Sequence, residues 1–207
     1  MNGELIFLVL FLLNILSLFI IRLYYTWKSP DRKKSVRTLT KQGFEHESPI
    51  TLAIGIFAGI LWVAAFILHI FFPHLLPLVL LPFPDLLRWI GVIIGFVSLA
   101  FFWWVHSALG QEFSKTLTIQ NQHRFVTDGP YRRIRHPMYA ALIPYFLSWC
   151  LISANLLYFL AWILVVIFMV ARIPSEEVML IDQFGDEYRE YMTRTGRLFP
   201  RASHANR

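Results

Sequence analysis

Long apolar segments alternate with short polar segments along the chain, and each apolar segment is long enough to form a membrane-spanning helix. A helix that rises 1.5 Å per residue crosses the hydrocarbon core, roughly 30 Å thick, in about 20 residues. The pattern predicts three such helices in the first half of the chain, over about residues 3–25, 49–72 and 86–108. Because residues 73–84 carry four prolines and no Lys or Arg, we expect this connector at the membrane face opposite to the basic loops.

A fourth apolar segment, residues 138–173, predicts a helical hairpin, because the small and polar run Ser153-Ala154-Asn155 divides it into two. Apolar residues then recur at helical spacing from Val178 to Tyr191, which predicts a C-terminal helix that begins at Pro174 or Ser175. The apolar side of this helix is expected either to rest on the bilayer or to cover the polar segment before the hairpin.

The composition agrees with a membrane protein, since 57% of the 207 residues are hydrophobic and the mean hydropathy is +0.54. The sequence therefore predicts an all-α fold: a polytopic membrane helical bundle of about five transmembrane helices with a C-terminal helical hairpin and a cytoplasmic C-terminal helix. We divide the chain into two regions. Residues 1–108 hold three N-terminal transmembrane helices and a cytoplasmic loop, 29–48, and residues 109–207 hold a cofactor-binding loop, the hairpin 138–173 and the helical tail.

The basic residues predict the orientation in the membrane. All of the 19 Lys and Arg except Arg88 fall on one side of the expected bilayer, and the positive-inside rule makes that side cytoplasmic. Since these bases lie in clusters between apolar segments, we expect membrane lipids and no nucleic acid as partners. The first apolar segment follows Glu4 instead of a basic start, so we expect a retained helix and no cleaved signal peptide.

Two features of the sequence are candidates for a metal site, and neither predicts one. The single cysteine, Cys150, lies within an apolar segment, where a small buried side chain is expected. The cluster Glu45-His46-Glu47 lies in a loop with the composition of a solvated segment. We therefore predict no metal.

A polar segment, VTDGPYRRIRHPMY at residues 126–139, lies directly before the hairpin and carries three arginines and His136. Such bases commonly anchor a protein on lipid phosphates. However, Arg172 and Glu176 end the last span on the same side of the membrane, and the tight hairpin allows them to meet the polar segment. Ionisable residues gathered at a membrane boundary favour a functional site.

These residues resemble a known family in two separate places. The pattern His-x2-Val-Thr-x-Gly-Pro-Tyr-x3-Arg-His-Pro-x-Tyr, followed by Arg-x3-Glu-Glu in the tail, is similar to the isoprenylcysteine carboxyl methyltransferase family. The resemblance covers roughly the C-terminal 95 residues. It implies an integral membrane enzyme that uses S-adenosylmethionine to methylate the carboxylate of a C-terminal prenylated cysteine or a similar lipidic carboxylate, releasing S-adenosylhomocysteine.

The resemblance also implies roles for particular residues. Arg172 would be the catalytic residue that faces the substrate carboxylate. The cofactor would enter from the cytoplasm, where the active site faces, and the prenylated substrate would enter sideways from the bilayer. The residues expected to bind the cofactor are Gln120, His123, Arg124, Phe125, Val126, Tyr131, His136, Pro137, Met138, Tyr139 and Glu176.

Three other interpretations remain open. Membrane sterol reductases, which bind NADPH, carry a similar Gly-Pro-Tyr and Arg-His-Pro-x-Tyr element, but their tails resemble a Cys-x2-Lys-Tyr-Gly-x2-Trp pattern that differs from this one. A phospholipid N-methyltransferase would use the same cofactor, and its amine acceptor would need to lose a proton, so its activity would rise with pH. A non-enzymatic membrane scaffold would keep the polar segment only for lipid binding. The oligomeric state cannot be read from the sequence, where Gly55 and Gly59 form only a weak dimer motif.

Overall fold

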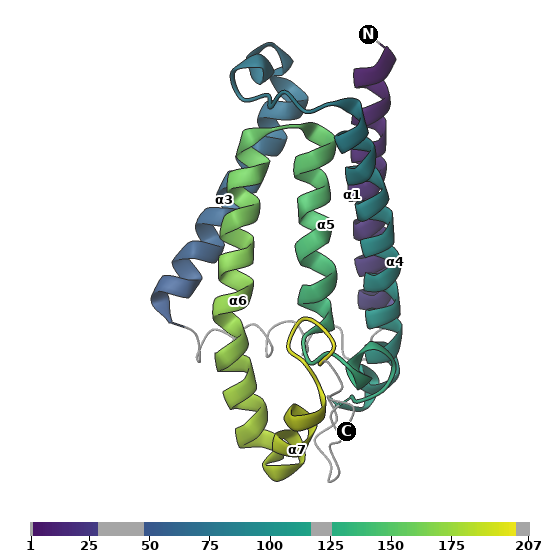
Figure 1. Ribbon diagram of the computed structural model, residues 1–207, viewed down its shortest axis with the longest axis vertical. Helices are drawn as coiled ribbons and strands as arrows, with labels where there is room; N and C mark the ends of the chain where they lie inside the picture. Colours follow the sequence, from purple (N-terminus) through teal and green to yellow (C-terminus); the bar gives the residue numbers. More distant parts are fainter. Residues whose placement is uncertain (1, 29–47, 117–125, 202–207) are drawn as a thin grey trace, which may run out of the picture.

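The computed structural model describes residues 2–28, 48–116 and 126–201, and these residues form an upright bundle of helices. The long helices run side by side, with α5 between α4 and α6, and α3 packed on α6 (Figure 1). Their bounds are α1 (Asn2–Lys28), α3 (Pro49–Phe71), α4 (Asp85–Thr116), α5 (Pro137–Ser153) and α6 (Leu156–Phe184). The shorter elements are the 3₁₀ helices η1 (Pro73–Leu78) and η2 (Gly129–Arg132) and the C-terminal helix α7 (Asp186–Arg194).

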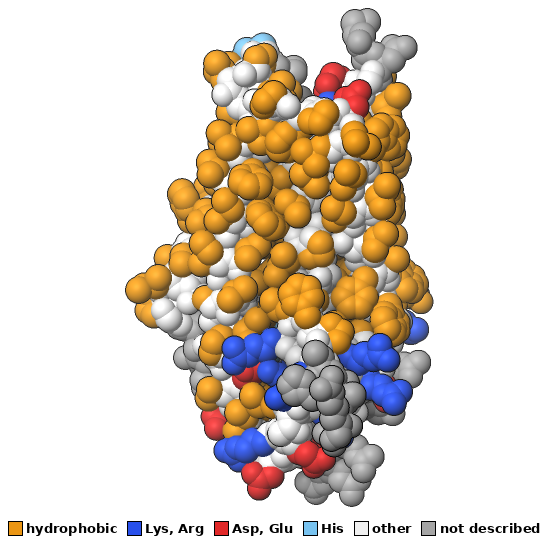
Figure 2. All heavy atoms as spheres, in the orientation of Figure 1, with side chains coloured by type: hydrophobic (Ala, Val, Ile, Leu, Met, Phe, Trp, Pro, Cys, Tyr) orange, Lys and Arg blue, Asp and Glu red, His pale blue; other side chains and the backbone are white. Residues whose placement is uncertain are grey.

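The bundle has the dimensions and surface of a multi-pass membrane protein. In the described part of the chain, α1, α3, α4 and α6 are the four helices long and apolar enough to cross a membrane, whereas α5 is apolar but only 17 residues long. Figure 2 shows hydrophobic side chains along the length of the helices, while Lys and Arg gather at the end that holds α7. We call this end the basic end. The prediction of an all-α polytopic membrane bundle is confirmed.

The predicted hairpin is present, and its turn is as tight as the sequence suggests. Ala154 adopts the left-handed conformation (φ 47°) and ends α5, while the side chain of Asn155 caps α6 by accepting a hydrogen bond from Leu157 N at 2.8 Å. The connector between η1 and α4 braces the turn, because Leu81 N donates to the carbonyl of Ala154 at 2.7 Å. The connector therefore lies at the end of the bundle opposite to the basic end, as predicted (Figure 1).

The predicted start of the tail helix is wrong, because α6 continues without a break through Pro174 and ends only at Phe184. Proline removes one helical hydrogen bond. The buried side chains of Ile173 and Glu177 on either side of it hold the helix in line. The separate C-terminal helix is α7, which starts after Gly185 (φ 57°) and folds back over the polar segment. Likewise, α4 extends beyond the expected residue 108, as far as Thr116.

Glycines bring α4 and α5 close together. A Cβ added at Gly91 would lie 2.6 Å from Leu151 Cβ, and one added at Gly95 would lie 2.5 Å from the buried side-chain nitrogen of Asn14. These two glycines are spaced one helical turn apart, as in small-x3-small packing motifs. Of the two glycines in the weak dimer motif, Gly55 packs against Phe168 of the same chain, with a 2.7 Å approach for an added Cβ, whereas an added Cβ at Gly59 would meet nothing within 4 Å.

Candidate functional site

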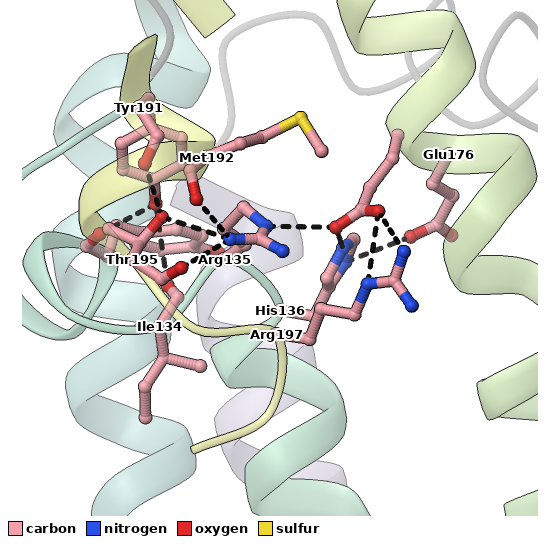
Figure 3. A network of polar contacts seen from close by, with 10 residues as sticks. Ile134, Arg135, His136, Glu176, Tyr191, Met192, Thr195 and Arg197 are labelled. Atoms are coloured by element: carbon pink, nitrogen blue, oxygen red, sulfur yellow. Dashed lines mark hydrogen bonds and ion pairs between the residues drawn. The ribbon is translucent and has the colours of Figure 1, made fainter. Parts of the chain in front are cut away.

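The start of α5, the basic end of α6 and the residues after α7 converge at the basic end of the bundle (Figures 1 and 3). Proline at the first helical position suits a helix start, since it needs no N–H partner there, and Pro137 begins α5 in this way. His136 and Tyr139 thus lie at the first turn of α5. Arg172 and Glu176 lie one turn apart on α6, because that helix does not break at Pro174. Four of the residues that the sequence singles out are therefore brought together.

Glu176 is the centre of this cluster. Tyr139 donates its hydroxyl to Glu176 Oε1, Arg172 Nε donates to the same oxygen at 3.2 Å, and His136 Nδ1 lies 3.4 Å from Oε2. The rings of His136 and Tyr139 are nearly parallel, with centroids 5.9 Å apart. The carboxylate is only partly enclosed, since the side chains of Glu176 and Arg172 are 25% and 26% exposed. An anionic group held in place by three side chains and still accessible is suited to bind a cationic ligand.

Glu177, the next residue, has a different environment. It is 3% exposed, and each of its carboxylate oxygens is bound by a different arginine: Arg135 Nε donates to Oε1 at 2.9 Å, and Arg197 Nη2 donates to Oε2 at 2.9 Å (Figure 3). The Nε2 atom of His136 lies 3.5 Å from Glu177 Oε1. The His136 ring therefore lies between the two adjacent carboxylates, Glu176 at one nitrogen and Glu177 at the other.

The residues after α6 close over this network. Arg135 Nη1 donates to the carbonyl of Met192 at 3.1 Å and to that of Thr195, so it caps the C-terminal end of α7. The Tyr191 hydroxyl donates to the carbonyl of Tyr131 at 2.6 Å, and burial raises the pKa of Tyr191 to about 12, which keeps this donor protonated. Of the two positions predicted for the tail, the one that covers the polar segment is thus confirmed.

The remaining predicted site residues are more scattered. Val126 is half-buried at the edge of the described segment, and burial raises the pKa of Tyr131, whose hydroxyl is therefore neutral. Pro137 is buried at the start of α5, and Met138, like Tyr139, packs against the bundle core. Four predicted residues lie outside the described residues: Gln120, His123, Arg124 and Phe125.

Three residues of the network have no role in the sequence-based prediction: Arg135, Glu177 and Arg197. The sequence does offer an indication for the first two, because Arg135 directly precedes His136 and Glu177 directly follows Glu176, and both neighbours are predicted site residues. Nothing in the local sequence distinguishes Arg197 from the other arginines of the tail, and only the fold brings it to Glu177.

A pocket of about 350 Å³ adjoins the network on the side of α6. Val170 and Ile173 of α6 form one wall, and Arg197, Leu198 and Phe199 form the other. The pocket is therefore apolar except at Arg197, whose guanidinium is bound to Glu177. No group of three or more His, Cys, Asp or Glu side chains that could hold a metal ion occurs among the residues that the structure describes. The Glu45-His46-Glu47 cluster lies outside them.

Comparison with known proteins identifies similar methyltransferases. A probable protein-S-isoprenylcysteine O-methyltransferase of Oryza sativa subsp. indica is 35% identical over 85 residues, which are 40% of this chain and 44% of that protein. Protein-S-isoprenylcysteine O-methyltransferase B of Arabidopsis thaliana is 29% identical over 131 residues, 53% of this chain and 66% of that protein. Methanethiol S-methyltransferase 1 of Bradyrhizobium diazoefficiens is 42% identical over 77 residues, 37% of this chain and 26% of that protein.

The chain thus spans less than half the length of the rice relative and about a quarter of the bacterial one. Residues 89–182 match the family model for isoprenylcysteine carboxyl methyltransferases. The matched segment includes His136, Tyr139, Arg172 and Glu176, the four residues of the partly exposed cluster. Over residues 89–182, the chain is therefore similar to the isoprenylcysteine carboxyl methyltransferase family.

Proposed function

We propose that the chain is an S-adenosylmethionine-dependent O-methyltransferase that acts on the carboxylate of a C-terminal prenylated cysteine or a similar lipidic carboxylate. The observation that carries this proposal is the Glu176 cluster, a partly exposed carboxylate held by Tyr139, Arg172 and His136 within the segment that matches the family. The catalytic part is residues 109–207, with the three N-terminal helices as its membrane support.

The residues of the cluster fit the cofactor. S-adenosylmethionine carries a cationic sulfonium, an ammonium and sugar hydroxyls, all of which a carboxylate can bind. Glu176 offers such a carboxylate with a quarter of its side chain exposed. His136 presents its Nδ1 to Glu176, while its buried Nε2 faces Glu177 Oε1 at 3.5 Å. The residues that would hold the cofactor are Val126, Tyr131, His136, Pro137, Met138, Tyr139 and Glu176, together with Gln120 and 123–125.

The chemistry requires few groups from the protein. When bound, S-adenosylmethionine supplies a methyl group already activated on its sulfonium sulfur. Transfer of that methyl group from the sulfonium to a carboxylate oxygen would give a methyl ester and S-adenosylhomocysteine. A carboxylate is already deprotonated at neutral pH, so no general base is needed. The protein contributes alignment, which can supply roughly 7–11 kcal/mol.

Arg172 is the residue that would align the acceptor. Its guanidinium lies beside Glu176 and is partly exposed in the second half of α6, where the apolar run of that helix meets its first charged residue. A guanidinium binds a carboxylate through two parallel hydrogen bonds and so fixes its direction. The shared contact with Glu176 limits how tightly Arg172 holds the acceptor, which leaves the acceptor oxygen nucleophilic.

The apolar pocket supports a lipidic acceptor. Val170 and Ile173 lie within one turn of Arg172 on α6, so the pocket lies at the same level of that helix as the proposed carboxylate-binding group, although Arg172 does not line it. The tail of a lipid entering from the bilayer could lie against these side chains while its carboxylate reaches Arg172. The gathering of Lys and Arg at this end supports an active site that faces the cytoplasm.

An assay of several acceptors tests the proposal. Purified protein in detergent would be incubated with methyl-labelled S-adenosylmethionine and either N-acetyl farnesylcysteine, its amide, phosphatidylethanolamine or methanethiol. We expect label only in the farnesylcysteine with a free carboxylate. Label in the phospholipid would show an N-methyltransferase.

A thiol acceptor is the second candidate, because the bacterial relative is named a methanethiol S-methyltransferase and is 42% identical over its matched residues. Methylation of methanethiol but not of the farnesylcysteine carboxylate would favour it. A carboxylate acceptor is the better match to Arg172, since a small thiol gains little from a partly exposed guanidinium.

A further inference from the structure

The last described residues are fixed to the loop that carries His136. Arg135 N donates to the carbonyl of Gly196 at 2.8 Å, Gly196 N donates to that of Arg133 at 3.1 Å, and His136 N donates to that of Arg197 at 3.0 Å. A turn follows these hydrogen bonds and brings the Phe199 carbonyl oxygen close to Gly196. A Cβ added at Gly196 would lie only 1.9 Å from that oxygen, so only glycine fits at position 196. Main-chain hydrogen bonds thus place Arg197 directly beside His136.

The side chain of Arg197 completes the surroundings of Glu177. It donates from Nε at 3.2 Å and from Nη2 at 2.9 Å to Glu177 Oε2, while Arg135 binds Oε1. Glu177 is 3% exposed, and burying a charged carboxylate costs folding free energy unless hydrogen-bond donors bind both of its oxygens. Without Arg197, Glu177 would have only Arg135 and the nearby edge of His136, and it would turn toward water or pull the histidine ring toward itself.

We propose that Arg197 is a positioning residue for the methyl donor: through Glu177, it sets the orientation of His136 and hence the contact of His136 with Glu176. This inference rests on the proposed function. Arg197 binds Glu177, and Glu177 lies 3.5 Å from His136 Nε2, so the effect of Arg197 reaches the donor site through these two residues. The proposal makes the segment after α7, which carries Arg197, part of the donor-binding site.

The test measures the dissociation constant of S-adenosylhomocysteine for the full-length wild type and for the variants Arg197→Ala, Arg197→Lys and Arg201→Ala. Arg201 lies on the same segment, is exposed and bonds only to the carbonyl of Thr193 in the contacts recorded for it, so it is the matched control. We expect Arg197→Ala to weaken binding about tenfold. A lysine at position 197 would keep the positive charge but would make one hydrogen bond to Glu177 in place of two. Arg197→Lys should therefore weaken S-adenosylhomocysteine binding about threefold.

Two further readouts separate positioning from loss of structure. In the methyl-transfer assay, KM for S-adenosylmethionine should rise in Arg197→Lys while KM for the acceptor stays within about twofold of the wild type. The melting temperature of Arg197→Lys should match that of Arg201→Ala. Wild-type donor affinity in both Arg197 variants would overturn the inference alone. A wild-type protein that binds no S-adenosylhomocysteine would overturn the proposed function and this inference with it.

Discussion

Two adjacent carboxylates in the site have opposite surroundings. Glu176 receives a hydroxyl, an imidazole and one arginine and stays a quarter exposed, whereas Glu177 is buried between two arginines. A carboxylate whose oxygens are both bound by guanidinium groups has little capacity left for a ligand. We therefore assign ligand binding to Glu176 and a supporting role to Glu177, although the sequence presents them as an equivalent pair.

Replacing Arg172 with alanine should mainly harm use of the acceptor. Loss of a charge-assisted pair of hydrogen bonds costs about 1.5–3 kcal/mol, so KM for the farnesylcysteine acceptor should rise about 10- to 100-fold. The dissociation constant of S-adenosylhomocysteine should change less than about threefold, since Glu176 keeps Tyr139 and His136. Steady-state kinetics and equilibrium binding measure the two effects. Arg189→Ala, which removes an exposed arginine on α7, is the control.

The assigned role of Arg172 would be wrong if Arg172→Ala lost donor binding and kept a normal acceptor KM. That result would move Arg172 into the donor site with Glu176. Retention of acceptor use by Arg172→Lys would show that charge alone is sufficient and that paired hydrogen bonds are unnecessary.

At the scale of helices, α4 packs closely on the second half of α5. The two helices approach at Gly91 and Gly95, and the buried Asn14 of α1 lies against the same place, where its carbonyl accepts from the Tyr145 hydroxyl at 2.9 Å. Helices in lipid associate through close packing, because lipid is as apolar as their side chains. The glycines thus hold α4 against the second half of α5.

Gly91→Ala should destabilise the protein by about 1–3 kcal/mol, because its added methyl group would overlap Leu151 Cβ, which cannot turn away. Gly59→Ala is a matched control in α3, where an added Cβ meets nothing within 4 Å. It should be neutral or slightly stabilising, since alanine is the better helix former. Thermal unfolding in detergent compares the two. Equal melting temperatures would contradict the close approach of α4 and α5.

The helices could be predicted from the sequence, but their ends and contacts could not. Hydrophobic length places α1, α3 and the starts of the later helices within a few residues, and Ser153-Ala154-Asn155 marks the hairpin turn, but the ends of α4 and α6 lie 8 and 11 residues beyond the predicted ones. Pro174 misleads, because local preference favours a helix start there while packing of the neighbouring buried residues continues α6. Gly55 and Gly91 are equally plausible packing sites in the sequence. Only the fold shows which helix each of them meets.

At the scale of the whole molecule, the site exists because three separate parts of the chain meet at one end of the bundle. Residues 133–136, 172–177 and 191–197 each contribute to the network (Figure 3). The sequence predicts that residues 133–136 and 172–177 meet, because the α5–α6 hairpin brings the second half of α6 back to the end of the bundle where α5 starts. The return of Gly196 and Arg197 depends on Gly185 and α7, whose direction has no signature in the sequence.

The predicted orientation can be tested with single cysteines. The native Cys150 is fully buried and would first be changed to serine. Asp186→Cys then places a thiol at the basic end, and His74→Cys places one at the opposite end, both at exposed positions. In intact cells, a membrane-impermeant maleimide should label only position 74, because the bases hold the other end in the cytoplasm. Labelling of position 186 before permeabilisation would invert the topology.

The central claim is that Glu176 and its partners form a site for S-adenosylmethionine, and direct binding tests it most simply. Calorimetry would measure S-adenosylmethionine, S-adenosylhomocysteine and NADPH binding to the purified wild-type protein and to Glu176→Gln. The account predicts that the wild type binds the two adenosyl ligands and not NADPH. Glu176→Gln should weaken that binding about tenfold or more, through loss of a charge-assisted hydrogen bond, while still melting cooperatively. Binding of NADPH alone, or unchanged affinity in Glu176→Gln, would contradict the account.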